Sequence, residues 1–222
     1  STPLLAKRNR TQRHPLFPPA IFAQRSFTIG AAGSALCQVG FFSIYFGLPL
    51  YMREVWSWSP LKIGFALIPL NVVPLLTAAV AGKIVDRQGP RPMVIFGGVW
   101  SGVSFLIIGF FLMEAGYILF ALGLLVSGLG AMAIGNNTTI ATLLDIEDGL
   151  LASASSASYT ARRLGSALGA VLTASIVGNR LGSDFKDVYI WVWILGAGAY
   201  LLGSLITYLY YPRPNEQELS NV

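Results

Sequence analysis

The sequence predicts an all-α integral membrane protein, a bundle of six transmembrane helices with both termini on the cytoplasmic side. Of its 222 residues, 54% are hydrophobic and only 11% are charged, whereas a soluble domain carries about 25% charged residues. Uncharged runs of 20 residues between Lys62 and Lys83 and of 22 residues between Arg91 and Glu114 are each long enough to cross a bilayer as a helix. A transmembrane barrel would instead alternate apolar and polar residues along each strand.

The chain divides into a linker, a helical bundle and a tail. Residues 1–26 are expected to form a basic cytoplasmic linker, either an ordinary polybasic segment beside the membrane or a dedicated site for anionic lipids. It has no short apolar segment followed by a small-residue cleavage site, so we expect no signal peptide. Residues 212–222 are expected to form a cytoplasmic tail. The six predicted spans between them are 27–52, 61–84, 92–113, 117–144, 151–178 and 188–211.

The first two spans are joined by a short outer loop that contains Trp56 and Trp58. Tryptophan rings are favoured at a membrane interface, which is where we expect this loop. The first span is rich in glycine and carries an aromatic stretch. The second span contains Pro69 and Pro74, and because proline removes a backbone donor, we expect a kinked helix there.

The third and fourth spans are joined by a tight outer turn, Glu114–Gly116. In the third span, Gly98 and Gly102 are four residues apart, a spacing typical of close packing between membrane helices. The fourth span is rich in glycine and includes a polar cluster with Asn136 and Asn137 in its inner half.

The fifth span follows an acidic inner loop, Asp145–Gly149, and opens with a run of alanine and serine. It contains an arginine pair that includes Arg162, and then Gly165 and Gly169, which again have the spacing for close helix packing. The sixth span has tryptophans at its outer end and tyrosines at its inner end, as expected at two membrane interfaces.

The distribution of cations supports this topology. With both termini inside, the inner segments hold eleven lysines and arginines and the outer segments hold four. Without the arginine pair of the fifth span, the numbers are nine and four. Because cytoplasmic loops carry the excess of Lys and Arg, these numbers predict that both termini lie on the cytoplasmic side.

The segment between the second and third spans carries a motif. It reads Gly82-x-x-x-Asp86-Arg87-x-Gly89-x-Arg91, and it resembles the cytoplasmic signature loop of the major facilitator superfamily of transporters. The resemblance implies a fold in which six helices with both ends inside form one half of the transporter.

Further stretches are similar to the fourteen-span drug:proton antiporters of this superfamily. They are Pro49–Tyr51, Trp58–Gly64 and Leu164–Gly169. The similarity runs from about Pro15 to Tyr211 and concerns the C-terminal half. Two positions depart from the family pattern, since Arg163 stands where glutamine is more usual and Tyr159 where asparagine is common. Both departures bear on the range of substrates.

The resemblance assigns a gating role to Gly82, Asp86, Arg87, Gly89 and Arg91. In the family, the acid of the loop pairs with a nearby arginine and faces the N-terminus of a helix in the opposite half, which closes the cytoplasmic side. A carboxylate at a helix N-terminus is stabilised by about 0.3–1 kcal/mol when exposed and by up to about 2 kcal/mol when partly buried. The alternative is that these cations only enforce the topology.

Polar and aromatic residues inside the spans are candidates for a substrate cavity. Adjacent residues point about 100° apart on a helix, so only one of Arg162 and Arg163 can readily face a cavity, and we expect Arg162. The amides could instead bridge helices, Arg162 could reach the inner headgroups, and the aromatic residues could face lipid. The candidates are Gln38, Phe42, Tyr45, Asn71, Asn136, Asn137 and Arg162.

Several kinds of site are not expected. A single cysteine, Cys37, and a single histidine, His14, leave no set of residues for an internal disulfide, a metal site or a catalytic centre. No acid lies inside a predicted span, whereas a proton antiporter needs a titratable group in the membrane. The resemblance to the drug:proton antiporters implies a proton gradient as the energy source and no cofactor, and the proton-carrying carboxylate is then expected in another part of the transporter.

These observations predict secondary active transport, as proton-coupled efflux of drugs or amphiphilic small molecules by alternating access. The chain would be one half of the transporter, in the plasma membrane or bacterial inner membrane. Its partner would be an N-terminal half of six to eight helices, in the same polypeptide or a separate chain, or else a second copy of itself. The alternatives are a non-transporting scaffold or degenerate half, an exporter of siderophores, amino acids or lipids, and a membrane enzyme, for which no catalytic constellation is present.

Overall fold

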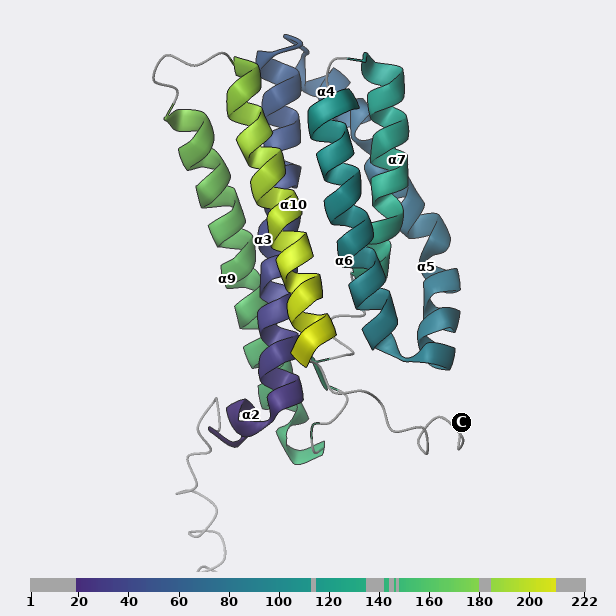
Figure 1. Cartoon of the computed structure of the whole chain (residues 1–222), viewed down its shortest axis with the longest axis vertical. Coiled ribbons are helices and arrows are strands. Elements are labelled where there is room, and N and C mark those ends of the chain that lie inside the picture. Colours follow the sequence, from purple (N-terminus) through teal and green to yellow (C-terminus); the bar gives the residue numbers. More distant parts are fainter. Residues whose placement is uncertain are drawn as a thin grey trace, which may run out of the picture.

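The computed structural model describes residues 19–112, 115–134, 142–143, 146, 148–179 and 185–210. These residues contain helices and no strand, which confirms the all-helical prediction for this part of the chain. Figure 1 shows the long helices standing side by side. In chain order, the helical elements are α2 (Pro19–Ala23), α3 (Arg25–Glu54), α4 (Pro60–Ala66), α5 (Ile68–Gln88), α6 (Pro90–Ile107) with a π-helical turn η1 (Ile108–Leu112), α7 (Tyr117–Ile134), a 3-10 turn η2 (Asp148–Leu150), α9 (Leu151–Gly178) and α10 (Phe185–Tyr210).

The helices depart from the predicted spans mainly at the turn between the second and third spans. The charged loop expected over residues 82–91 narrows to Gly89, because α5 continues to Gln88 and α6 begins at Pro90. Gly89 has φ 75°, a conformation that side chains with a Cβ rarely adopt. Pro90 follows in the first turn of α6, where the missing N–H costs nothing.

The kink expected in the second span is a complete break between α4 and α5. Pro69 has no N–H to offer a preceding carbonyl, and the helix is interrupted just before it, at Leu67. Side chains satisfy carbonyls at the break. The amide of Asn71 donates to the Leu67 oxygen at 3.1 Å, and the hydroxyl of Tyr117 donates to the Ala66 oxygen at 3.5 Å.

Glycines allow α3 to pack tightly against α9. A Cβ placed on Gly165 would overlap the backbone carbonyl of Ala35, and one placed on Gly169 would overlap that of Val39. A pair of hydroxyl–backbone bonds, each 3.3 Å long, joins Ser43 to Gly169 and Thr173 to Ser43 across the same contact. The two backbones therefore approach as closely as small residues permit.

The helix α10 packs between α3 and α6, again at glycines. A Cβ on Gly40 of α3 would lie 2.7 Å from the carbonyl oxygen of Gly196. On α6, a Cβ on Gly98 would overlap the hydroxyl of Ser204, and one on Gly102 would lie 2.8 Å from Leu201. Further contacts join α6 to α7 and α7 to α5, so that each long helix has a packed neighbour.

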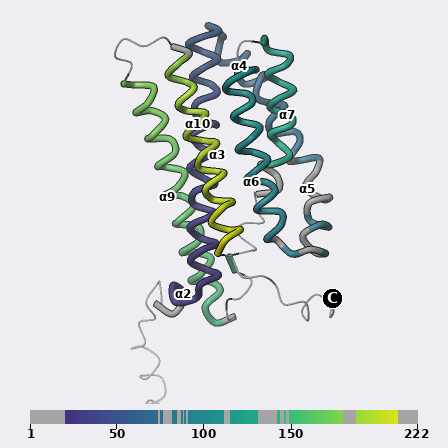
Figure 2. Tube along the Cα trace, viewed as in Figure 1, coloured from purple at the N-terminus to yellow at the C-terminus, as the bar shows by residue number. Residues whose placement is uncertain are grey.

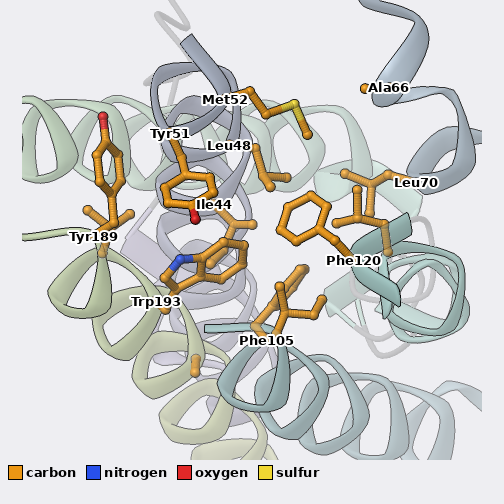
Figure 3. Close-up of a cluster of buried hydrophobic side chains, with 14 of the residues drawn as sticks. Ile44, Leu48, Tyr51, Met52, Ala66, Leu70, Phe105, Phe120, Tyr189 and Trp193 are labelled. Atoms are coloured by element: carbon orange, nitrogen blue, oxygen red, sulfur yellow. The ribbon is translucent and has the colours of Figure 1, made fainter. Parts of the chain in front are cut away.

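A core of aromatic and aliphatic side chains closes one end of the bundle. Figure 3 shows these side chains converging from α3, α5, α6, α7 and α10. Tyr51 lies at its centre, with its ring 5.3 Å from Tyr189 and 5.4 Å from Trp56. Trp56 in turn packs 4.8 Å from Trp58 and 5.2 Å from Phe120. The two loop tryptophans, which the sequence places at an interface, therefore also seal the end of this core.

Three helical segments are long and apolar enough to cross a bilayer, within the part of the chain that the structure describes. Two shorter apolar segments, Pro60–Val73 and Tyr117–Gly130, accompany them. The number of six spans, like the orientation of the termini, stays a prediction. The three long segments are Arg25–Glu54, Arg91–Phe111 and Asp187–Tyr210.

Candidate functional site

The helix ends bring the motif-bearing segments to one end of the bundle. The turn between α5 and α6 lies at the same end as the beginning of α3, the beginning of α9 and the end of α10 (Figures 1 and 2). The connections from α3 to α4 and from α6 to α7 lie at the opposite end. This up-and-down arrangement is the one that the predicted topology requires, and it makes the α5–α6 turn the first part of the candidate site.

Arg91 connects the α5–α6 turn to α10. Its Nη2 donates a hydrogen bond of 2.9 Å to the backbone oxygen of Tyr208, in the last turn of α10. Carbonyls in the last turn of a helix lack intrahelical partners and carry its negative partial charge, so a guanidinium is favoured there. The Nε atom of Arg91 is also buried, without a hydrogen-bond partner among the described residues. Arg91 therefore holds the turn against the end of the sixth predicted span.

The other motif residues lie at the end of α5. Asp86 and Arg87 fall in its last turn, and Gly82 and Arg87 are exposed, while the side chain of Asp86 lies outside the described part. A cation at this position is favoured by the dipole of its own helix, whereas a carboxylate is disfavoured. The gating role that the resemblance assigns to Asp86 stays a prediction.

The second part of the candidate site is a stripe on α3, which we call the exposed stripe; Tyr45 is exposed in it, and Gln38, Phe42 and Pro49 are partly buried. Gln38 and Phe42 are two residues away from Gly40, so at 3.6 residues per turn they lie almost opposite the contact with α10. The ring centroid of Phe42 lies 6.4 Å from that of Tyr45 and 6.4 Å from that of Phe46 along this surface. Tyr45 is 39% exposed and Phe46 48% exposed, so the surface presents aromatic rings.

The exposed surface of α9 has two different flanks. The apolar flank carries Leu164, Leu168 and Val171 and leads to Ser175, which lines a groove against α10. On the other side of the α3 contact lies the polar flank, whose members recur at intervals of three, four or seven residues. They are the polar residues Ser156, Tyr159 and Arg163, followed by the small residues Ala170, which is partly buried, and Ala174. The polar flank of α9 and the exposed stripe of α3 therefore lie on the side of the bundle away from α10.

The two arginines of α9 are placed differently. Arg162 is half-buried beside the contact with α3, and Arg163 is exposed on the polar flank. Arg163 donates from Nε to the hydroxyl of Tyr159 at 2.8 Å and also contacts it through Nη2. The guanidinium carbon lies 4.8 Å from the centre of the Tyr159 ring. We expected Arg162 to face the cavity, whereas the more accessible charge belongs to Arg163.

The pair of Tyr159 and Arg163 was not among the predicted site residues. Two signals were present in the sequence: the spacing of four, which brings the side chains together on a helix, and the departure of both positions from the family pattern. An arginine facing lipid at a helix centre costs about 2.5–3.5 kcal/mol. The polar flank is therefore a poor lipid-facing surface.

The remaining candidates are placed as follows. Asn71 is exposed, but its amide is engaged with the helix break in its own segment rather than with a neighbouring helix. Asn136 and Asn137 lie outside the described residues. Glu54, predicted in a loop, is the last residue of α3 and accepts a hydrogen bond of 2.7 Å from Tyr189. Asp187, also expected in a loop, lies in the first turn of α10.

Comparison with known families agrees with the helix arrangement and the motif at the α5–α6 turn. Residues 30–221 match the family model of the Major Facilitator Superfamily. The chain belongs to this superfamily. As a superfamily member with several apolar helices, it is an integral, multi-pass membrane protein. Superfamily members are generally transporters rather than enzymes.

The relatives of this superfamily chain include transporters named for export. A tetracenomycin C resistance and export protein of Streptomyces glaucescens is 24% identical over 78% of this chain and 32% of its own length. The multidrug export protein EmrB of Escherichia coli K12 is 25% identical over 77% of this chain and 33% of its own length. A riboflavin transporter, RibZ, of Clostridioides difficile strain 630 is 27% identical over 75% of this chain and 36% of its own length. The chain thus spans about a third of the length of these relatives.

Proposed function

We propose that the chain forms the C-terminal half of a secondary transporter that exports amphiphilic small molecules by alternating access, driven by a proton gradient. The observation that carries the proposal is the surface opposite α10, where the exposed stripe of α3 adjoins the polar flank of α9. The aligned part of this chain covers only about a third of these relatives, and such a surface suits a cavity shared with a second half.

The proposed cavity combines two kinds of surface. The aromatic side chains of α3 offer apolar area to the body of a substrate, and the hydroxyl and guanidinium groups of α9 offer hydrogen bonds that orient it. Ligand sites in proteins are largely apolar with a few placed polar groups, which is the composition found here. In repeat-built transporters, substrate binds near the midplane between the halves, and rocking of one half against the other changes access.

Proton coupling would depend on another part of the transporter. The described acids, including Glu54 and Asp187, lie at helix ends, and Asp86 lies in the last turn of α5. A group that carries protons across a membrane must titrate within it. This chain would accordingly supply one wall of the cavity and the cytoplasmic gate, and the other half would supply the titrating carboxylate.

The first test is the composition of the native particle. The chain is extracted gently from its native membrane, and the intact masses of all copurifying polypeptides are measured. We expect a longer covalent polypeptide or a second membrane chain in equal amount, and proton-driven dye efflux after reconstitution. A stable homodimer would mean that a second copy supplies the other half. A monomer with no companion and no efflux would contradict the proposal and indicate a scaffold.

Replacement of Asp86 by Asn tests the gate. Loss of the charge is expected to weaken the closed cytoplasmic side by up to about 2 kcal/mol, because a carboxylate at a helix N-terminus is stabilised by that amount when partly buried. In the complete transporter, a reporter cysteine introduced at Ser156 should then react faster with a membrane-impermeant thiol reagent applied from the cytoplasmic side. Cys37 is buried and gives little background.

Asp187→Asn is the matched control, since Asp187 is an exposed acid at the other end of the bundle. It should leave the labelling rate unchanged. Equal labelling of Asp86→Asn and the unmodified transporter, together with unchanged transport, would show that Asp86 has no part in closing the cytoplasmic side.

A further inference from the structure

We propose that Tyr159 and Arg163 form a binding site for the oxyanion group, a carboxylate or phosphate, of an amphiphile. The inference rests on the proposed transport function and narrows its substrate class, since it makes the cargo an amphiphilic anion. It is carried by the geometry of this pair, by its place along α9 and by the charges around it.

The tyrosine orients the guanidinium and leaves one edge of it available. The hydroxyl of Tyr159 accepts from Nε and Nη2 of Arg163, which form one side of the guanidinium fork, and the ring of Tyr159 lies beneath the guanidinium carbon. The opposite donors, on Nη1 and the outer hydrogen of Nη2, have no hydrogen-bond partner among the described residues. Two parallel donors in one plane match the two oxygens of a carboxylate or phosphate.

The pair lies near the middle of α9. Arg163 is roughly 18 Å along the helix from Leu151, at about 1.5 Å per residue. At that depth an exposed guanidinium is unfavourable against lipid hydrocarbon, and both side chains lie on the polar flank rather than among Leu164, Leu168 and Val171. An anion that neutralises Arg163 would remove this penalty, and the resulting hydrogen bonds would be little weakened by competition from water.

The neighbouring charges favour an anion over a cation. Arg163 itself is positively charged, and no carboxylate of the described residues is within ion-pair distance of it. A positive potential on a cavity wall concentrates ligands of opposite charge. Helix α3 packs against α9, and the aromatic rings of its exposed stripe would receive the apolar body. A lipophilic cation would meet repulsion on this wall.

The test uses three probes that share one apolar body: 1-pyrenebutyrate, 1-pyrenebutanol and 1-(4-trimethylammoniobutyl)pyrene. Binding is measured by energy transfer from tryptophan, with the chain and all its native companions in nanodiscs of phosphatidylcholine and empty nanodiscs as background. We expect the butyrate to bind about tenfold or more tightly than the butanol, because hydrogen bonds to charged groups are the strong ones. The cation should bind most weakly.

Arg163→Gln should lower the affinity for 1-pyrenebutyrate about tenfold or more and leave that for 1-pyrenebutanol unchanged. Tyr159→Phe, which keeps the ring and removes the acceptor that orients the guanidinium, should cause a smaller loss for the butyrate alone. Arg53→Gln is the control, because Arg53 is an exposed arginine at the far end of α3. Arg163→Lys retains the positive charge but lacks the two parallel donors of the guanidinium. It replaces Arg163→Gln as the test variant if Arg163→Gln is not monodisperse, and it should also bind 1-pyrenebutyrate more weakly than the unmodified chain does.

Two sources of the anion are separated by repeating the titration in nanodiscs that contain phosphatidylglycerol. If cargo supplies the oxyanion, the effect of Arg163→Gln on butyrate binding persists there. If a bilayer lipid supplies the oxyanion, phosphatidylglycerol abolishes the effect of Arg163→Gln on butyrate binding. Phosphatidylglycerol should then also copurify with the unmodified chain but not with Arg163→Gln. That result would confirm the anion site and overturn its assignment to cargo. Equal losses for butyrate and butanol, or no loss for either, would overturn the anion site itself.

Transport measurements separate this inference from the proposed function. Arg163-dependent binding of 1-pyrenebutyrate without proton-driven efflux of any probe would retain the anion site and contradict transport. Proton-driven efflux with no preference for the anion, unaffected by Arg163→Gln, would retain transport and contradict the anion site.

Discussion

Gly165→Ala is expected to destabilise the bundle by about 1–3 kcal/mol, the usual cost of adding a methyl group to a well-packed contact. The added Cβ would overlap the carbonyl oxygen of Ala35, and the other nearest atoms are the carbonyl carbon and Cα of the same residue. Backbone atoms in the middle of α3 cannot rotate away as the end of a side chain can. The helices would have to separate, which would also weaken the hydroxyl–backbone bonds at Ser43. The measurement is the free energy of unfolding in mixed micelles titrated with sodium dodecyl sulfate.

The same substitution at Gly178, in the same helix, separates this effect from helix propensity. A Cβ at Gly178 has no neighbouring atom within 4 Å, and alanine is favoured over glycine in a helix by up to about 1 kcal/mol. Gly178→Ala should therefore be neutral or slightly stabilising. If both variants changed the stability alike, close packing of α9 on α3 at Gly165 would not be the reason for glycine there.

Arg91→Ala is expected to loosen the end of α10. A hydrogen bond from a charged group contributes about 1.5–3 kcal/mol, and the bond from Arg91 to the Tyr208 carbonyl joins the α5–α6 turn to the last turn of α10. Its removal would leave the end of α10 held by fewer contacts and free to fray. Backbone amides in the last two turns of α10 should exchange with deuterium about tenfold faster or more, since each 1.4 kcal/mol corresponds to a factor of ten.

Arg87→Ala is the matched control for Arg91→Ala. It removes the same charge from the same turn, but Arg87 is exposed and no hydrogen bond to α10 accompanies it. Exchange in α10 should then stay near that of the unmodified chain. Equal acceleration in both variants would show that the net charge of the turn, and not the bond to Tyr208, stabilises the end of α10.

The local features of the fold could be predicted well from the sequence. The bounds predicted for the fifth span coincide with those of helix α9, and a kink was expected in the second span because proline cannot donate a backbone hydrogen bond. The extent of the α5–α6 turn could not be predicted in the same way. Charged residues such as Asp86 and Arg87 were assigned to a loop because they are polar, but polarity at a helix end does not prevent helical backbone, and only Gly89 interrupts the helix.

The sequence by itself determined that this is a helical membrane protein of the Major Facilitator Superfamily, because apolar length and a local motif are properties of the chain read in order. Tertiary structure decided which surface is free. Whether Arg162 or Arg163 is accessible depends on where α3 contacts α9, and that contact is set by Gly165 and Gly169 meeting backbone atoms more than a hundred residues away. A helix has several faces formed by apolar or small residues, and only packing against its neighbours decides which of these faces remains exposed.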